Sequence, residues 1–228
     1  MTEKKEIVND KDFIELEFTG RTKDEYEVFD TTNINIAREE GIYRKNKEYG
    51  PVKICIGTGL LLQGLDKQLI GKEVGKKYTI EIKPEEAYGR KNPKLIQLIP
   101  LNAFRKDNIK PTPGLVVNVD GIEGVVRAVS GGRVIVDFNH PLASKKLVYE
   151  VEIKRKITDP KEKLESLLAI YLNVKPEEIE INKEESKFKA IIKTNKKFNE
   201  NYIKEIKDKI KEIAEIQDCE LSFKEKNK

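Results

Sequence analysis

Alternating apolar and polar positions predict several short strands in the first ninety residues. The segments that alternate with the period of two typical of a half-buried strand are 13–18, 26–29, 52–56 and 78–82. Residues 60–70 instead carry leucines at helical spacing and end at Gly71, which predicts a short helix. Residues 33–49 are charged and only faintly patterned, so we expect them to form a surface excursion.

The pattern changes after residue 90. Residues 91–139 contain short strand-like runs separated by prolines and glycines, which predicts a compact all-β unit. Residues 146–153 then alternate again, like a final strand that the first domain still lacks. We therefore infer that 91–139 is inserted into a discontinuous domain made of 1–90 and 140–155.

Residues 156–228 predict a further domain. Asp159 can cap a helix that has Pro160 at its first position, and Asn199 opens a long amphipathic helix. The strand-like segments of this part are 179–181, 188–192 and 221–223. The order α-β-β-α-β is that of an independent α+β domain. The isoleucine stripe of the second helix is too short for a coiled coil, so we expect it to pack on the domain's own sheet. The expected fold class of the chain is α+β.

Charge and composition narrow the possible functions. Lys and Arg number 44 against 40 Asp and Glu, and the two signs are interspersed. Nucleic acid is therefore not expected as a partner, because such binding needs concentrated positive charge. The polar start and the lack of a long apolar run predict a cytoplasmic protein that does not enter a membrane. The Lys-, Glu- and Ile-rich usage is typical of thermophile proteins.

The residues available for catalysis exclude most enzyme classes. One histidine and two dispersed cysteines leave no Cys/His metal site, and no phosphate-binding loop is present. We therefore expect no metal and no cofactor. Rotation about an X-Pro bond is chemistry that needs neither. Its barrier of roughly 18–20 kcal/mol comes from amide resonance, which a dry apolar pocket disfavours. Shortening a step of about 100 s to about 1 ms would need a reduction of about 7 kcal/mol.

Five motifs in register resemble those of FKBP-type peptidyl-prolyl isomerases. They are Phe-Thr-Gly at 18–20, Val-Phe-Asp-Thr-Thr at 28–32, Ile-Gly-x-Gly-Leu-Leu-Leu-Gln-Gly-Leu at 56–65, Ala-Tyr-Gly at 87–89 and Leu-Val-Tyr-Glu-Val-Glu at 147–152. The resemblance covers residues 10–155, apart from extra residues around 33–49. The insert and its return through 137–143 are similar to the SlyD-like branch of the family. In that branch an insert-in-flap domain binds unfolded polypeptide.

The resemblance implies a set of site residues. The proline pocket would be lined by Phe18, Phe29, Leu61, Leu62, Leu65 and Tyr149. Asp30 would lie at the pocket wall, and the Tyr88 hydroxyl would hydrogen-bond a substrate carbonyl. Further substrate-binding positions are Val52 and Ile54 at the pocket edge, with Leu142 and Ala143 in the return from the insert. Phe18 stands where the family commonly has Tyr, and Leu65 where many members have Trp. The His-rich metal-binding tail of some SlyD-like proteins is absent, so nickel binding does not carry over.

Each of these residues also has a plainer interpretation. On periodicity alone, the three aromatic residues Phe18, Phe29 and Tyr149 would be core. Asp30 before two threonines could be an ordinary turn residue, and Tyr88 a turn aromatic. His140 is expected to be a structural hinge residue rather than an acid or base.

The insert carries a dense apolar segment that could bind polypeptide. The candidate chaperone patch is Ile96, Leu98, Ile99, Leu101 and Phe104. Such a patch would hold unfolded or proline-containing polypeptides and raise their local concentration. The alternative is that these side chains form the small domain's only core. For the whole chain, the alternatives to an isomerase with a chaperone domain are a polypeptide-binding chaperone with a degenerate isomerase site, and an assembly scaffold. The scaffold would form a homodimer through the C-terminal domain.

Overall fold

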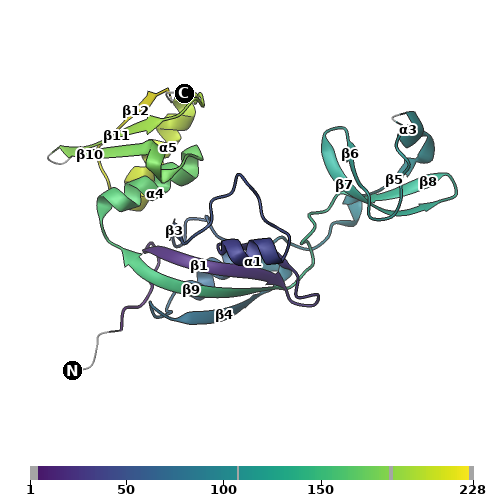
Figure 1. Ribbon diagram of the computed structural model, residues 1–228, viewed down its shortest axis with the longest axis horizontal. Coiled ribbons are helices and arrows are strands. Elements are labelled where there is room, and N and C mark those ends of the chain that lie inside the picture. Colours follow the sequence, from purple (N-terminus) through teal and green to yellow (C-terminus); the bar gives the residue numbers. More distant parts are fainter. Residues whose placement is uncertain (1–4, 107, 185–186, 226–228) are drawn as a thin grey trace. The chain divides into compact units, whose positions relative to one another are not determined.

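A computed structural model describes residues 5–106, 108–184 and 187–225 as a mixed α/β protein with antiparallel sheets and few helices (Figure 1). The strands are β1 (Phe13–Thr22), β2 (Val28–Thr31), β3 (Val52–Cys55), β4 (Lys77–Ile82), β5 (Ile96–Pro100), β6 (Val116–Val119), β7 (Ile122–Ser130), β8 (Arg133–Asp137), β9 (Leu147–Ile157), β10 (Ile179–Glu184), β11 (Lys187–Lys193) and β12 (Cys219–Lys224). The α-helices are α1 (Ile34–Glu39), α2 (Gln63–Leu69), α3 (Leu101–Lys106), α4 (Pro160–Leu172) and α5 (Glu200–Ala214), and the short 3-10 helices are η1 (Pro84–Glu86), η2 (Pro93–Leu95) and η3 (Pro176–Glu178).

The chain divides into two compact units. The first contains residues 1–21, 28–80 and 148–228, and the second contains 22–27 and 81–147. In the described residues, no helix is long and apolar enough to span a membrane.

A five-stranded sheet forms the N-terminal part of the first unit. Its order is β2-β1-β9-β4, with β3 paired to β1, and β1 runs antiparallel to both β2 and β3. The strands predicted at 13–18, 52–56 and 78–82 are confirmed. Ile14 and Leu16 on β1 are fully buried, as the alternation requires.

Two helical segments of this part differ from the prediction. Helix α2 begins at Gln63, so Leu61 and Leu62 lie before it rather than on its face. Helix α1 lies in the segment expected to be an irregular excursion. The Asn33 side chain caps it by accepting hydrogen bonds from two backbone N–H groups, and Ala37 is its only buried residue. One buried position in six residues gives no periodicity to detect.

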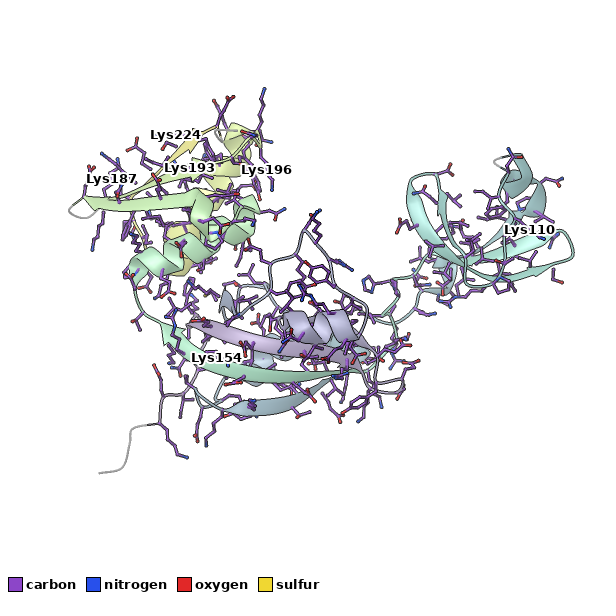
Figure 2. The ribbon with its side chains drawn as sticks, in the orientation of Figure 1. Lys110, Lys154, Lys187, Lys193, Lys196 and Lys224 are labelled. Carbon is purple, nitrogen blue, oxygen red and sulfur yellow. The ribbon has the colours of Figure 1, made fainter. Side chains whose placement is uncertain are left out.

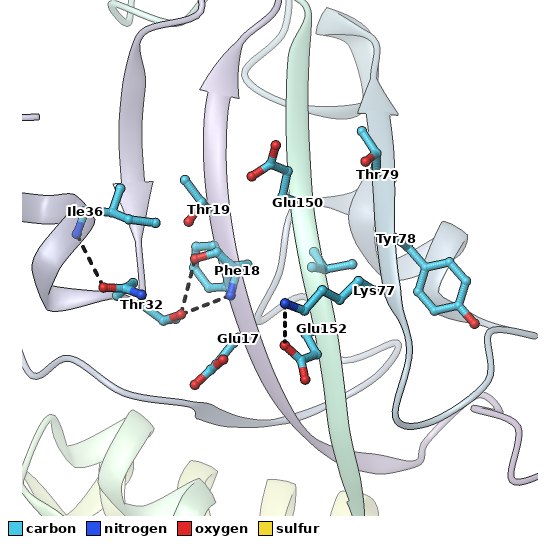
Figure 3. Close-up of a pocket in the computed structure, with 12 residues that line it drawn as sticks. Glu17, Phe18, Thr19, Thr32, Ile36, Lys77, Tyr78, Thr79, Glu150 and Glu152 are labelled. Carbon is cyan, nitrogen blue, oxygen red and sulfur yellow. Dashed lines mark hydrogen bonds and ion pairs between the residues drawn. The ribbon is translucent and has the colours of Figure 1, made fainter.

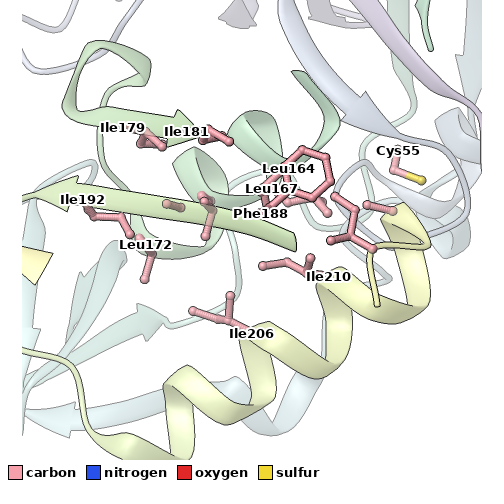
Figure 4. Close-up of a cluster of buried hydrophobic side chains, with 14 of the residues drawn as sticks. Cys55, Leu164, Leu167, Leu172, Ile179, Ile181, Phe188, Ile192, Ile206 and Ile210 are labelled. Carbon is pink, nitrogen blue, oxygen red and sulfur yellow. The ribbon is translucent and has the colours of Figure 1, made fainter. Parts of the chain in front are cut away.

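The C-terminal part of the first unit has the predicted order α-β-β-α-β. Its sheet has the order β10-β11-β12, with β11 antiparallel to β10 and parallel to β12. Side chains of α4, α5 and the sheet form one core, and Ile206 and Ile210 of the isoleucine stripe are buried in it, as expected (Figure 4). The same core includes Phe13 of β1 and Cys55 of β3. The packing is therefore shared with the N-terminal sheet, which differs from the independent domain that the sequence predicted.

The sheet face turned away from this core is charged. Lys187, Lys189 and Lys193 alternate with the buried residues of β11. Lys187 and Lys193 are labelled in Figure 2. Lys193 pairs with Glu180, and Lys189 Nζ lies 2.6 Å from Glu184. A homodimer through this domain stays a prediction. This face of the sheet carries ion pairs, whereas a dimer interface on it would be expected to be apolar.

The second unit contains a four-stranded antiparallel sheet of order β5-β8-β7-β6. Its small core consists of Phe104, Val117, Val126, Val134 and Val136. The prediction of an all-β insert is wrong, because α3 follows β5 directly. Leu101 and Phe104 are three residues apart on α3 and pack into this core. A helix of six residues is too short to show its period in the sequence.

Candidate active site

Three aromatic side chains, which we call the aromatic cluster, meet on the first unit. Phe18, Phe29 and Tyr149 come from β1, β2 and β9, respectively. The ring centroids of Phe18 and Tyr149 are 5.7 Å apart and tilted by 56°, and those of Phe29 and Tyr149 are 5.7 Å apart in an edge-to-face pair at 79°. Both geometries are favourable for aromatic quadrupoles. Tyr149 is buried while Phe18 and Phe29 are half-buried, so the cluster presents a partly open apolar surface.

Gly20 makes this packing possible. A Cβ atom placed at Gly20 would lie 2.7 Å from Phe29 Cζ and 3.0 Å from Tyr149 Cε1, closer than carbon atoms tolerate. The two rings therefore lie directly against the β1 backbone. The sequence analysis names Gly20 only as part of the motif at 18–20 and does not assign it to the site. Its position two residues after Phe18, within that motif, was the signal available in the sequence.

Threonine hydroxyls fix the backbone that carries the cluster. Thr32 Oγ1 accepts a hydrogen bond from Phe18 N at 3.0 Å and donates one to Phe18 O at 3.2 Å (Figure 3). Thr31 and Thr19 share a buried hydroxyl–hydroxyl hydrogen bond of 2.8 Å. These bonds tie the end of β2, where Asp30 stands, to the middle of β1.

A small hollow on the same sheet has a mixed polar and apolar lining that also includes Phe18. It has a volume of about 310 Å³ and is lined by charged residues including Glu17, Lys77, Glu150 and Glu152 (Figure 3). The charged residues make this hollow a less favourable site for an apolar proline ring than the aromatic cluster, because burial of apolar surface drives such binding.

Asp30 has a partner that the sequence did not reveal. Its carboxylate forms an ion pair with Lys47, which comes from the segment between α1 and β3. The Lys47 ammonium also lies 5.5 Å from the centroid of Tyr49, and that ring stacks on Tyr43 at 5.6 Å. Lys47 lies in the charged segment read as a surface excursion, where no local pattern distinguishes it from the neighbouring lysines.

The predicted aliphatic site residues come from β3, from α2 and from the segment between these two elements. Leu65 on α2 is 1% exposed, and its place at a pocket floor stays a prediction. Phe18, Val52, Ile54 and Leu61 line a common groove of about 1220 Å³. Leu62 is half-buried at the start of α2. The structure thus brings the predicted pocket edge together with one ring of the aromatic cluster.

Three other predicted residues belong to the second unit. The Tyr88 ring stacks on His140 with the centroids 4.2 Å apart and the planes within 5°. His140 Nδ1 accepts a hydrogen bond from Leu142 N at 3.2 Å, and Ala143 is buried. His140 therefore contacts both the Tyr88 ring and the backbone of the return from the insert. The hydrogen bond from Tyr88 to a substrate stays a prediction.

The candidate chaperone patch divides between surface and core. Leu98 is 60% exposed and Ile96 is 43% exposed, both on β5. Phe104 is buried in the core of the second unit, and Ile99 and Leu101 pack against it. The last three side chains thus take the core role that the sequence left as the alternative, and only Ile96 and Leu98 are presented to solvent.

Comparison with known proteins identifies the family. A short-type peptidyl-prolyl cis-trans isomerase of Methanocaldococcus jannaschii is 35% identical over 127 residues, which cover 56% of this chain and 81% of the relative. An FKBP-type 16 kDa peptidyl-prolyl cis-trans isomerase of Escherichia coli is 35% identical over 108 residues, covering 45% of this chain and 72% of the relative. The chain belongs to the FKBP-type peptidyl-prolyl cis-trans isomerases. This confirms the resemblance seen in the motifs, and the family consists of enzymes.

The insert identifies the branch of this FKBP-type isomerase. A family model described as FKBP26, IF domain, matches residues 97–142. The FKBP-type isomerase SlyD of Vibrio cholerae is 35% identical over 106 residues, covering 45% of this chain and 53% of the relative. The SlyD-like assignment is therefore confirmed, and the matched segment overlaps most of the predicted insert at 91–139.

Proposed function

We propose that this FKBP-type isomerase rotates X-Pro bonds against the aromatic cluster while its insert holds unfolded polypeptide. The observation that supports this proposal best is the packing of Phe18, Phe29 and Tyr149 into one partly open apolar surface against Gly20. No acid, base, metal or cofactor is needed for this reaction.

The rings act by shape and by exclusion of water. The planar amide of an X-Pro bond owes its barrier of roughly 18–20 kcal/mol to a resonance form that places charge on the carbonyl oxygen. Rings packed around a proline remove the water that stabilises this charge, and a rigid wall can favour the twisted amide. Asp30 at the edge of the cluster is held by Lys47, so its carboxylate has a defined direction. In the proposal, Asp30 orients the amide region and Tyr88 hydrogen-bonds a substrate carbonyl.

The isomerase proposal is tested with a short X-Pro peptide whose exchange is followed by NMR. Asp30→Ala and Tyr88→Phe are expected to lower kcat/KM by about ten- to a hundredfold, because each removes one group that is proposed to act on the substrate. Circular dichroism of both variants controls for folding. A wild-type rate equal to the rate in buffer would overturn the proposal in favour of a chaperone with a degenerate site.

The insert offers an apolar sheet face for unfolded chains. Directly paired residues of an antiparallel sheet lie on the same face. Leu98 pairs with Ile135, which pairs with Ala128, and these residues cross β5, β8 and β7 in one row. A second row on the same face runs from Ile96 through Asp137, which is buried, and Val125 to Val116, which is 60% exposed. The exposed side chains at its two ends are therefore apolar, although the row contains one buried carboxylate. We call this face the outer face of the insert.

The edge of the same sheet adds hydrogen-bonding capacity. Strand β5 lies at one end of the sheet order, so one side of its backbone is not paired within the sheet. An extended chain can pair with such an edge while its apolar side chains lie on exposed leucine and isoleucine. Both features suit unfolded polypeptide, which is extended and apolar, better than a folded partner.

Binding of permanently unfolded, reduced and alkylated α-lactalbumin tests the chaperone role. Leu98→Asp is expected to weaken binding by about tenfold, because it places a charge in the outer face. Ile122→Asp is the matched control. Ile122 is 61% exposed against 60% for Leu98, but it pairs with Val119 on the core side of the sheet. Equal losses in the two variants, or no loss in Leu98→Asp, would contradict the assignment of the outer face.

A further inference from the structure

A groove of about 1220 Å³ in the first unit has one wall from the N-terminal sheet region and one from the C-terminal domain. Phe18, Ile54 and Leu61 line the first wall, and Ile170, Val174 and Lys196 line the second. Ile170 belongs to α4, Val174 follows that helix, and Lys196 lies between β11 and α5. The volume exceeds the roughly 300–1,000 Å³ of pockets for small molecules, so an elongated ligand fits the groove better.

The two walls are held together by packing and by charge. Phe13 and Cys55 lie in the same hydrophobic core as Leu164 and Leu167 of α4. Lys53 on β3 lies 2.8 Å from Glu162. The hydrogen bond from Arg155, joined by that from Lys53, lowers the pKa of Glu162 to about 2 against the opposing effect of burial. The groove is therefore a built feature of this unit rather than a gap between loosely joined domains.

Most charged side chains of the groove have a partner of opposite sign in or beside its walls, and the Lys196 ammonium donates a hydrogen bond to the Asn173 carbonyl oxygen. Lys47 pairs with Asp30, and Lys175 pairs with Glu48 at 3.2 Å. Glu165 lies 3.7 Å from Lys53. Walls with both signs in pairs create no strong potential, so they do not favour a polyanion or another highly charged ligand. Apolar side chains such as Phe18 and Ile170 also line the groove. An uncharged, extended polypeptide matches this mixture of apolar surface and paired charge.

The groove shares one residue with the aromatic cluster. Phe18 belongs to both, because its ring lies 5.7 Å from Tyr149 and also lines the groove. Lys47 lines the groove and holds Asp30. We propose that the C-terminal domain forms the second wall of an extended substrate site, in which the groove binds the residues that flank the isomerised X-Pro bond. This rests on the proposed isomerase function of the aromatic cluster.

Two peptides with the same X-Pro core test the proposal. One is short, and the other extends the core by several uncharged residues on each side. In the wild type, the long peptide should show a kcat/KM about tenfold above that of the short one. Ile170→Asp should remove this gain while leaving the short peptide unchanged, because Ile170 lies in the far wall. Phe223→Asp is the matched control in the same domain, since Phe223 is 39% exposed against 38% for Ile170.

The outcomes separate this proposal from the one on which it rests. Absence of turnover with the short peptide would overturn the isomerase function itself. Normal short-peptide turnover with no gain for the long peptide, or a gain that survives Ile170→Asp, would overturn only the groove proposal. NMR of the wild type gives an answer that does not depend on a variant. Amide signals of residues 169–176 and 194–196 should shift with the long peptide and not with the short one, and unmoved signals would refute the groove.

Discussion

Gly20→Ala adds a single methyl group directly beneath the aromatic cluster. The new carbon would lie 2.7 Å from Phe29 Cζ and 3.0 Å from Tyr149 Cε1. Carbon atoms in contact normally lie about 3.5–4.0 Å apart, so the Phe29 ring would have to withdraw by about 1 Å. Overpacking of this kind costs about 1–3 kcal/mol of folding free energy, offset by about 0.4–1 kcal/mol from the less flexible unfolded chain. We expect a net loss of about 1–2 kcal/mol.

The effect on catalysis should exceed the effect on folding. A displacement of about 1 Å at a reacting group can cost about a hundredfold in rate, so we expect kcat/KM for a short X-Pro peptide to fall by about ten- to a hundredfold. Urea unfolding and NMR exchange measure the two effects on the same samples. Phe29→Leu in the Gly20→Ala background should restore stability, because the smaller side chain leaves room for the methyl group. A kcat/KM of Gly20→Ala within about twofold of the wild type would refute the argument that ring position governs turnover.

Three further predictions concern individual charged groups and thiols. Lys47→Met should change the free energy of unfolding by less than about 1 kcal/mol, because the pair with Asp30 is partly exposed, and should lower kcat/KM by at most about fivefold. Asp137→Asn should cost the second unit about 1–3 kcal/mol in urea unfolding at pH 7. Burial opposes its charge, but hydrogen bonds from Lys91, Asn139 and Arg127 outweigh burial and keep the pKa of Asp137 below its usual range. A lowered pKa adds stability above the unfolded-state value of about 3.9, so wild-type stability should fall as pH drops below about 4, and the variant's should fall less. Burial raises the pKa of Cys55 to about 12 and that of Cys219 to about 11, so iodoacetamide at pH 8 should label both thiols in urea and neither in the folded protein.

Local signals predicted most of the elements. The strands on both sides of the insert alternate with a period of two, and the caps Asp159 and Asn199 mark the starts of α4 and α5 correctly. Each of these signals lies within a few residues of the feature that it predicts. Helix α3 was not predicted, because its first apolar residues follow those of β5 directly and no polar segment separates the two elements.

The patch on the insert shows why exposure was harder to predict. Residues 95–101 are almost continuously apolar, so their alternation between two faces cannot be read from residue type. The faces follow from pairing, because Ile99 lies opposite the buried Val134 and Leu98 opposite Ile135. The ion pair of Lys47 with Asp30 was not predicted for a related reason. Its contact with Asp30 joins residues 17 positions apart and depends on how the segment after α1 folds back.

Because the C-terminal domain shares a hydrophobic core with the N-terminal sheet, deleting the domain cannot isolate its role in substrate binding. A truncation after Arg155 would leave Phe13 and Cys55 without the core that now buries them. Exposing one large apolar side chain costs about 1.5–3 kcal/mol, and the loss would fall on β1 and β3. Those strands carry Phe18 and Ile54, so a truncated chain would lose activity whether or not the domain touches substrate. A substitution at Ile170 leaves the core intact, because that side chain already faces solvent. Loss of the long-peptide gain in Ile170→Asp, with short-peptide turnover preserved, is therefore evidence for a substrate wall that truncation cannot supply.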